Sequence, residues 1–262
     1  MKIKLGCDPE AFMQDTHGQL RSAVGLIGGS KEYPMPLPLG DGFAVQEDNV
    51  ALEFNIPPAE GRSEFVSHIR TTLDFLTKVI GEAYGFTINQ SSAASFPEAE
   101  LVTPQARMFG CDPDYNAYTK LPNRKPKAED ENLRSCGGHV HVGYDISKAD
   151  GVHLIKMMDL FLGVPSVLMD DGQLRKELYG QAGAYREKSY GVEYRTLSNF
   201  WIFKDRLIEW VWDNTDKATT AAESRLTLSE EDSTDIVNAI NNNDKTLAMK
   251  LVKKFNLEVI NV

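Results

Sequence analysis

Residues 138–143 read Gly138-His139-Val140-His141-Val142-Gly143 and alternate polar and apolar side chains at the period of a β-strand. Because successive side chains on a strand point to opposite faces, both imidazoles project from one face and both valines from the other. Three more segments share this design and carry carboxylate, amide or arginine side chains on the polar side: 3–10, 49–56 and 192–195. The four segments predict a sheet with one apolar face and one chemically active face.

The polar face of this sheet gathers groups that bind metal ions and phosphate. Its paired side chains are Asp8 with Glu10, Glu53 with Asn55, His139 with His141, and Glu193 with Arg195. An ordinary half-exposed antiparallel sheet carries Thr, Lys, Ser and Gln on its wet face instead. Carboxylates and imidazoles at this density repel one another unless a cation lies among them, so the pattern favours Mg²⁺ or Mn²⁺ and phosphoryl chemistry.

The length and charge of the chain limit its class. A chain of 262 residues is long for one average domain and fits one large α+β domain with a full core. The formal net charge of -10 argues against broad binding to nucleic acid or to anionic membranes, because both need a positive field. The net charge does not exclude a local patch of basic residues.

The cysteines and the N-terminus indicate a reduced, cytoplasmic protein. Cys7, Cys111 and Cys136 are widely spaced and odd in number, which suits neither a disulfide framework nor a paired zinc site. Charges at positions 2, 4 and 8 interrupt any signal-peptide core, and the chain lacks a continuous apolar run long enough to span a membrane. We therefore expect no membrane association.

The rest of the sequence predicts loops and helices around the sheet. Gly and Pro predict a long structured loop over 14–45, and charged residues predict a mobile loop over 121–135, of a kind that can close over a substrate but whose role the sequence leaves open. Apolar residues at intervals of three and four predict a helix over 63–84 that ends at Gly85. Further helices are expected over 147–170 with a break at Pro165, over 204–214, from Ser229 to 241–243, and from Asp244 to Asn256.

Each candidate residue also has a plainer interpretation. Asp8 and Glu10 flank Pro9, and Asp-Pro commonly marks a turn. Glu53, in contrast, lies in mid-strand and needs a partner. The histidine pair holds two of the five histidines of the chain, which favours ligand roles over structural ones. A zinc hydrolase could use such a pair as well.

Cationic side chains near the last strand suit phosphate or carboxylate. Arg186, Lys188 and Arg195 lie close to Glu193 in the sequence, although a surface ion-pair patch would also explain them. Lys31 could touch phosphate, but its Gly-Gly-Ser-Lys loop lacks the spacing of a Walker P-loop, and a generic exposed lysine is the better interpretation. The cysteines are interpreted as buried small hydrophobes and not as thiol nucleophiles.

Taken in order, four motifs resemble the phage-type amidoligases (COOH-NH2 ligase type 2) of the carboxylate-amine ligase superfamily, which is related to glutamine synthetase and glutamate-cysteine ligase. They are Gly-Cys-Asp-Pro-Glu at 6–10, Asp-Asn-Val-Ala-Leu-Glu-Phe-Asn at 48–55, Gly-Gly-His-Val-His-Val-Gly at 137–143, and Tyr-Gly-Val-Glu-Tyr-Arg-Thr-Leu-Ser-Asn-Phe-Trp at 190–201. The resemblance covers the catalytic domain that we predict over 1–215. A helical C-terminal appendage over 216–262 lies outside it.

The resemblance implies a curved, mainly antiparallel sheet of the glutamine synthetase type, with helices on its apolar face. It also implies ATP and several divalent cations, Mg²⁺ or Mn²⁺, on the polar face. In such enzymes a substrate carboxylate takes the γ-phosphoryl group of ATP. An amine then displaces phosphate from the acyl phosphate, which leaves an amide or isopeptide-like bond.

Carried over motif by motif, the resemblance assigns roles to individual residues. The metal ligands would be Asp8, Glu10, Glu53, His139 and Glu193, the nucleotide contacts His141, Arg195, Lys31 and Lys188, and the catalytic residues Arg195, Arg186 and Glu53. Arg195, with Arg186 nearby, would offset charge on the transferred phosphoryl group. Asp8 stands where Glu is commoner in the synthetases, so its coordination could pass through water.

The resemblance leaves the substrates and the assembly open. Because no glutamate- or cysteine-binding pattern is recognisable, the carboxylate and the amine could belong to small molecules, peptides or a protein. Members of this type are associated with phages, which implies the cytoplasm of an infected host cell. Related synthetases form rings, so homo-oligomerisation stays open. Two other functions also remain: a metal-dependent hydrolase, and a phage-associated binding protein that keeps the fold without turnover.

Overall fold

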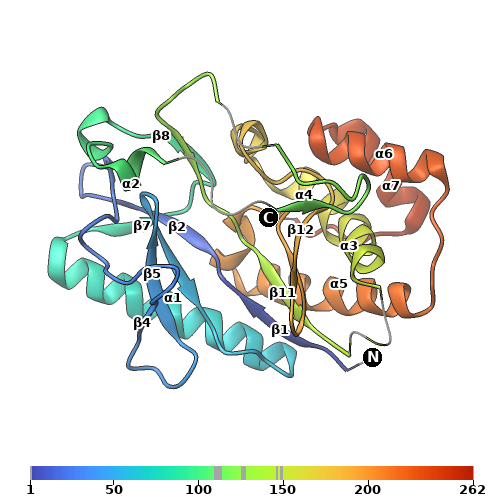
Figure 1. Ribbon diagram of the computed structural model, residues 1–262, viewed down its shortest axis with the longest axis horizontal. Coiled ribbons are helices and arrows are strands. Elements are labelled where there is room, and N and C mark those ends of the chain that lie inside the picture. The colour runs from blue at the N-terminus through green and yellow to red at the C-terminus, as the bar shows by residue number, and fades with distance from the viewer. Residues whose placement is uncertain (1, 109–113, 125–127, 146, 148–149, 262) are drawn as a thin grey trace.

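The computed structural model describes residues 2–108, 114–124, 128–145, 147 and 150–261, and two antiparallel sheets form a curled surface at its centre (Figure 1). The first sheet has the order β1-β11-β13-β12-β9, with bounds Lys4–Cys7, Val140–Gly143, Gly191–Tyr194, Ala184–Lys188 and Tyr115–Asn116. The second has the order β3-β2-β6-β5-β4, with bounds Leu20–Arg21, Glu10–Gln14, Ala51–Asn55, Ala44–Asp48 and Met35–Pro36. A further strand, β7 (Thr87–Asn89), also pairs with β2.

The two large sheets meet where β1 passes into β2 through Asp8 and Pro9. Residues 3–10, which the alternation predicted as one strand, therefore belong to strands of two different sheets. The physical reason is Pro9, which has no N–H to continue a ladder and whose carbonyl accepts from Phe54 N at 3.2 Å. Glu10 N donates to Gly137 O at 2.9 Å, so the chain entering β11 is tied to the same junction.

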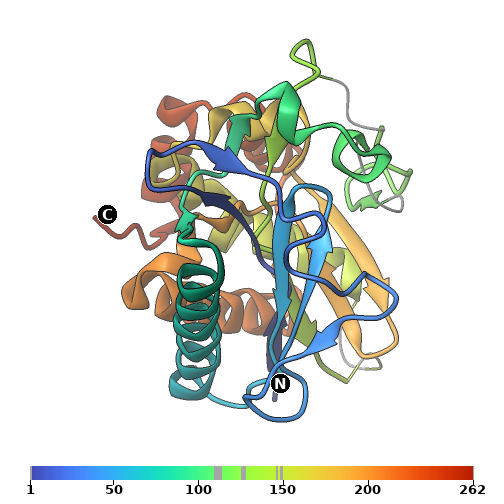
Figure 2. The ribbon, with the colours of Figure 1, turned by 90° about the vertical axis from the view of Figure 1, so that its left-hand side faces the viewer.

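The helix predicted over 63–84 is confirmed as α1 (Arg62–Tyr84). Its buried apolar side chains recur at helical spacing: Phe65, Ile69, Leu73, Leu76 and Ile80. Gly85 ends the helix in the left-handed conformation at φ 68°, which a residue without a side chain adopts at least cost. Figure 2 shows α1 alongside α5 (Asp205–Glu223) on one side of the sheets.

The second predicted helix is interrupted by a π-helical turn. It consists of α3 (Gly151–Met158), the π-helical turn η2 (Asp159–Gly163) and α4 (Val164–Met169). The predicted break at Pro165 therefore lies just before that residue, because Pro165 occupies the first turn of α4, where its missing N–H is not needed. The third helix, α5, extends nine residues beyond the predicted end at 214, to Glu223.

Two C-terminal helices follow the predicted caps. Ser229 and Asp244 each accept a backbone N–H at the start of α6 (Glu230–Asn241) and α7 (Lys245–Phe255). Both helices share a buried cluster with α4, in which Ile240 and Leu251 contact the α4 region. The domain boundary proposed at 215/216 lies inside α5, and the separate helical pair begins only after Glu223.

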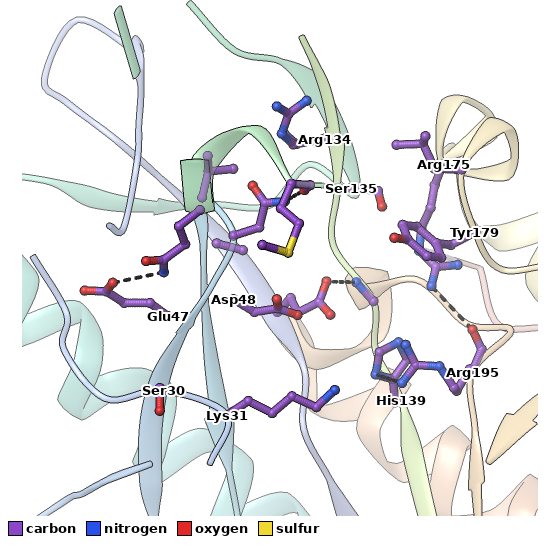
Figure 3. Close-up of a pocket in the computed structure, with 18 of the residues that line it drawn as sticks. Ser30, Lys31, Glu47, Asp48, Arg134, Ser135, His139, Arg175, Tyr179 and Arg195 are labelled. Carbon is purple, nitrogen blue, oxygen red and sulfur yellow. Dashed lines mark hydrogen bonds between the residues drawn. The ribbon is translucent and has the colours of Figure 1, made fainter. Parts of the chain in front are cut away.

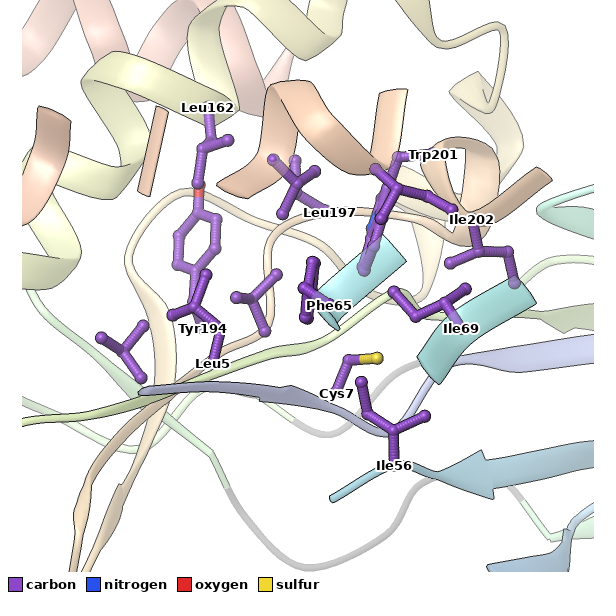
Figure 4. Packing of buried hydrophobic residues seen from close by; sticks show 14 of the residues in the cluster. Leu5, Cys7, Ile56, Phe65, Ile69, Leu162, Tyr194, Leu197, Trp201 and Ile202 are labelled. Atoms are coloured by element: carbon purple, nitrogen blue, oxygen red, sulfur yellow. The ribbon is translucent and has the colours of Figure 1, made fainter. Parts of the chain in front are cut away.

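The apolar face of the first sheet packs on α1, α3 and α5 (Figure 4). The labelled members of this core come from both the sheet and the helices: Leu5, Cys7, Ile56, Phe65, Ile69, Leu162, Tyr194, Leu197, Trp201 and Ile202. Burial raises the pKa of the Cys7 and Cys136 thiols, which confirms that these two are buried small hydrophobes. Cys111 lies outside the described residues.

One helical segment, Gly151–Met169, is long and apolar enough on average to cross a bilayer. Buried residues make up 72% of its most apolar window, and it contains Lys156 and Asp159. Such burial is typical of a core helix, and this segment forms the centre of the helical layer.

The two long loops contain short strands. Residues 14–45 hold β3, β4 and the first residues of β5, which join this stretch to the second sheet. The end of the 121–135 stretch is not loop: β10 (Leu133–Ser135) pairs with β8 (Ala93–Ser95), because Leu133 and Arg134 are buried. Residues 125–127 lie outside the described part, and closure over a substrate stays a prediction.

Candidate active site

The strand register brings the polar side chains of the sheet into rows. In the first sheet Gly6, His141, Glu193 and Arg186 lie opposite one another across β1, β11, β13 and β12. In the second sheet Glu10 lies opposite Glu53 and Glu53 opposite Gln46. The single polar face predicted from the alternation is therefore formed by both sheets, with Asp8 at their junction.

A first cluster contains Asp8, His139, His141 and Glu193. Asp8 Oδ1 lies 3.2 Å from His139 Nδ1 and 3.1 Å from His141 Nε2. His139 Nδ1 is also 3.8 Å from Glu193 Oε1. Tyr190 Oη contacts the other nitrogen of His141, Nδ1, at 2.8 Å, so Nε2 is left facing the carboxylates.

Three cations surround Glu193, whose side chain is fully buried. Lys188 Nζ lies 2.7 Å from Glu193 Oε2, Arg186 Nη1 lies 3.6 Å from Oε1, and Arg195 Nη1 contacts Oε1. Burial and the charge of Asp8 oppose ionisation of Glu193, but Arg195 and the histidines outweigh them and lower its pKa to about 2. Glu193 is therefore an anion at neutral pH despite its burial.

The two histidines differ in their protonation. Burial, together with the charge of Arg195, lowers the pKa of His139 to about 4. Its imidazole is therefore neutral at pH 7, which is the form that binds a metal ion. Burial opposes protonation of His141 too, but the adjacent Asp8 carboxylate outweighs it and raises the pKa of His141.

A second cluster contains the carboxylates of Glu10, Asp48 and Glu53, each of which offers an oxygen within 4.8 Å of the others. Burial and the charge of Asp48 raise the pKa of Glu10 to about 8. Burial has the largest effect on Glu53, followed by the negative charges of Asp8 and Asp48, and together they raise its pKa well above its ordinary range. Three carboxylates at this distance, of which Glu53 is buried and Glu10 and Asp48 are half-buried, must either share protons or hold a cation.

The donor sets of both clusters fit a divalent metal ion. In the first cluster, Asp8, His141 and Glu193 also offer one atom each within 4.8 Å of one another. Within the described part of the chain, Asp8 Oδ1, His141 Nε2 and Glu193 Oε2 are buried atoms without a well-aligned hydrogen bond. Carboxylate oxygen with one imidazole suits Mg²⁺ or Mn²⁺, and the all-carboxylate second cluster suits them equally.

A pocket of about 300 Å³ opens beside the second cluster (Figure 3). Among the predicted residues, Glu10, Lys31, His139 and Arg195 line it. Figure 3 shows the Lys31 side chain extended into the pocket toward His139, and its nucleotide contact stays a prediction. Glu53 belongs to the second cluster, and the other candidates, Asp8, His141, Arg186, Lys188 and Glu193, lie in or around the first.

Two residues of this site were missed in the sequence. Asp48 ends β5, and Asn49 follows it in the left-handed conformation at φ 59°. The run Glu-Asp-Asn at 47–49 is typical of a turn, so the sequence held a turn signal but no ligand signal. Arg175 lies in a short 3-10 helix, η3 (Gln173–Glu177), and is only 2% exposed although it lines the pocket. No pattern around it pointed to the site.

Residues 131–261 match a family described as "Phage phiEco32-like COOH.NH2 ligase-type 2". The chain belongs to this family. The match extends through α6 and α7, which the motif resemblance had placed outside the family region. No curated protein matches the chain.

The COOH.NH2 ligase family region supplies only part of the site. It contains His139, His141, Glu193 and Arg195 on β11 and at β13. Asp8 and the whole second carboxylate cluster come from the first 55 residues, which the family match does not include. In this member of the family the candidate site is therefore completed only where the two sheets meet.

Proposed function

We propose that this protein is an ATP-dependent and divalent-metal-dependent carboxylate-amine ligase with a glutamine synthetase-like sheet. One observation carries the proposal: two separate ligand sets for divalent ions flank His139 and Arg195 on one polar face. Two neighbouring metal sites beside cationic side chains are the usual equipment for phosphoryl transfer.

In the proposed reaction a carboxylate oxygen of the substrate attacks the γ-phosphorus of ATP, and ADP leaves. The amine then attacks the acyl carbon, phosphate leaves with the bonding electron pair, and the amine nitrogen loses a proton. Free carboxylate is a poor electrophile because it is anionic, whereas the acyl phosphate has a good leaving group. Divalent ions held by the carboxylates and histidines of the two clusters would offset the negative charge of the phosphate groups.

The residues of the chain have distinct roles in this scheme. Asp8, His139, His141 and Glu193 would hold one ion, and Glu10, Asp48 and Glu53 would hold another. Arg195 would offset charge on the transferred phosphoryl group, with Arg186 and Lys188 beside it. Lys31 would contact the nucleotide from the opposite wall of the pocket.

The substrates are proposed as a small-molecule, peptide or protein carboxylate and an amine. The phage-like family suggests that the reaction takes place in the cytoplasm of an infected cell. Measurement of the mass of the protein in solution would determine whether it forms a homo-oligomer.

Phosphate release from ATP tests the proposal. The protein would be incubated with Mg²⁺ or Mn²⁺ and a panel of amino acids, polyamines and small peptides, with Glu193→Gln as the blank. Release that requires both a carboxylate and an amine supports the ligase. Metal-dependent hydrolysis of amides or esters without ATP would instead support a hydrolase, and binding of ATP without turnover would support a non-catalytic binding protein.

A further inference from the structure

Asp159 is a fully buried carboxylate that belongs to neither metal-ligand cluster. It lies in η2, the π-helical turn, on the apolar side of the first sheet. We propose that Asp159 is a positioning residue that fixes Arg195 from behind the sheet. This inference rests on the function proposed above, because it concerns the contact of Arg195 with a phosphoryl group.

Asp159 accepts hydrogen bonds from the residues directly before and after Arg195. Its Oδ1 accepts from Tyr194 Oη at 2.7 Å and from Thr196 Oγ1 at 3.2 Å. These two donors are the immediate neighbours of Arg195. The same carboxylate accepts from Gly183 N through Oδ2 at 2.6 Å, just before β12 begins. One buried group therefore holds the end of β13 and the start of β12 together.

The π-helical turn makes room for the hydrogen bond between Tyr194 and Asp159. Val164 N donates to Asp159 O five residues back, which closes the wider turn. A side chain on Gly163 would place Cβ 2.8 Å from Tyr194 Oη and 3.3 Å from Asp159 Oδ1. Gly163 therefore leaves room for the tyrosine hydroxyl to reach the carboxylate.

Arg175 holds the same backbone from the pocket side. Its Nη1 donates to Thr196 O at 3.0 Å and its Nη2 to Arg195 O at 3.4 Å. Arg195 N in turn donates to Ala184 O at 2.9 Å. The peptide groups on both sides of Arg195 are thus fixed, and its side chain, which pairs with Glu193 and Asp114, lines the pocket.

An ionised carboxylate suits this role because it accepts hydrogen bonds and donates none. Tyr194 Oη and Gly183 N must then both donate to Asp159, and the Thr196 hydroxyl is shared between Asp159 and Gln181 O, at 3.2 and 3.0 Å. Asparagine has the same shape, but its NH₂ group would face one of the donors. Asp159→Asn is therefore expected to release one bond and shift Arg195 without opening a cavity.

Binding of two nucleotides tests the role. Calorimetry would compare Mn²⁺-ADP with Mn²⁺-AMPPNP, a non-hydrolysable ATP analogue that carries a third phosphoryl-like group. Asp159→Asn should weaken AMPPNP binding about tenfold and ADP binding less than about twofold, since small misplacements of a charged group are costly. Arg195→Ala gives the loss of AMPPNP affinity that is expected when the Arg195 side chain is absent. Asp232→Asn is the matched control, because Asp232 is a buried Asp of α6 that bonds to the N-cap Ser229 and to Lys254 of α7.

Three results would overturn the inference. Asp159→Asn could bind AMPPNP as the wild type does while Arg195→Ala does not, or it could lose both nucleotides equally, which indicates general loosening. If wild-type protein binds neither nucleotide, the proposed function itself fails. Should Asp159→Asn not fold, Tyr194→Phe removes one donor and leaves the carboxylate in place, and the same selective loss for AMPPNP is expected.

Discussion

Asp8 Oδ1 lies 3.1 Å from His141 Nε2, although the two residues are on different segments and neither has the other as its strand partner. The residue opposite His141 is Gly6, where a Cβ would be only in ordinary contact with the His141 Cβ, at 3.7 Å. The missing side chain at Gly6 keeps the space beside His141 open. Asp8, two residues further along and past the end of β1, turns its carboxylate into that space.

Asp8→Asn is expected to lower the affinity for Mn²⁺ by at least about tenfold, because it removes one ligand charge and keeps the shape. Titration of the metal followed by electron paramagnetic resonance measures this directly. Asp232→Asn, remote from both clusters, should bind as the wild type does. Equal Mn²⁺ affinity in Asp8→Asn and the wild type would remove Asp8 from the ligand set.

Glu193→Gln should abolish turnover and also cost stability in metal-free protein. The sequence alone suggests little effect on the fold, but the carboxylate is fully buried and contacts Lys188, Arg186 and Arg195. Removing its charge leaves these cations less well compensated, at an expected cost of about 1–3 kcal/mol. Urea unfolding in EDTA would measure it, and an unchanged free energy of unfolding would show that the cations turn to water instead.

Arg195→Ala should weaken binding of ATP, like that of AMPPNP, by at least about tenfold, and should lower kcat by a larger factor because the charge that Arg195 would offset grows in the transition state. Loss of one preorganised charged donor typically costs about 10²–10³ in kcat. Arg195→Lys keeps the charge but loses the planar fork, so it should recover only part of the rate. A kcat within about twofold of wild type in Arg195→Ala would assign this residue a structural role.

Asp159 should make the free energy of unfolding of the protein decrease as the pH rises. Burial raises its pKa from 3.8 to about 6, against the hydrogen bonds from Tyr194 and Gly183. Stability from the protonated form is fully present below about pH 4 and is lost as pH rises through about 6, by up to about 3 kcal/mol. The stability of the wild type relative to Asp159→Asn should therefore fall from about pH 4.5 to about 7.5 in denaturant unfolding. A constant difference would contradict the shift.

Gly180→Ala should destabilise the fold more than Gly18→Ala. Both glycines have nearly the same backbone conformation, with φ 76° and 78°. A Cβ at Gly180 would lie 1.9 Å from Arg175 Nη1, whereas a Cβ at Gly18 meets no atom within 4 Å. The conformational cost is shared and about 1 kcal/mol, and the clash should add about 1–3 kcal/mol at Gly180. Equal losses in thermal unfolding would mean that Arg175 moves aside freely.

Local sequence signals predicted the helices well. Gly85, Ser229 and Asp244 are caps whose chemistry acts within one turn of the backbone, so they mark helix ends without any tertiary context. The end of α5 was missed because its last turns are stabilised by burial of Ala218 and Ala222, which no local signal reports. Helix caps can therefore be predicted from the local sequence, whereas tertiary packing cannot.

The candidate residues were predictable where strand alternation placed them on one face. His141 and Glu193 sit in strands and His139 comes directly before β11, and the period of two alone sends them to the same side. Asp48 and Arg175 could not be found this way, because one ends a strand at a turn and the other lies in a 3-10 helix. Their place in the site depends on how the sheets curl around the junction.

Alternation of side chains along each strand is a local property, and it suffices to give this chain its polar face, its apolar core and its set of metal-ligating groups. The division of those groups into two clusters is not local. It arises because Pro9 cannot continue the ladder, so that Asp8 joins the histidines of one sheet while Glu10 joins Glu53 and Asp48 in the other. Distances between residues far apart in the chain depend on sheet pairing and curvature, which no single segment encodes.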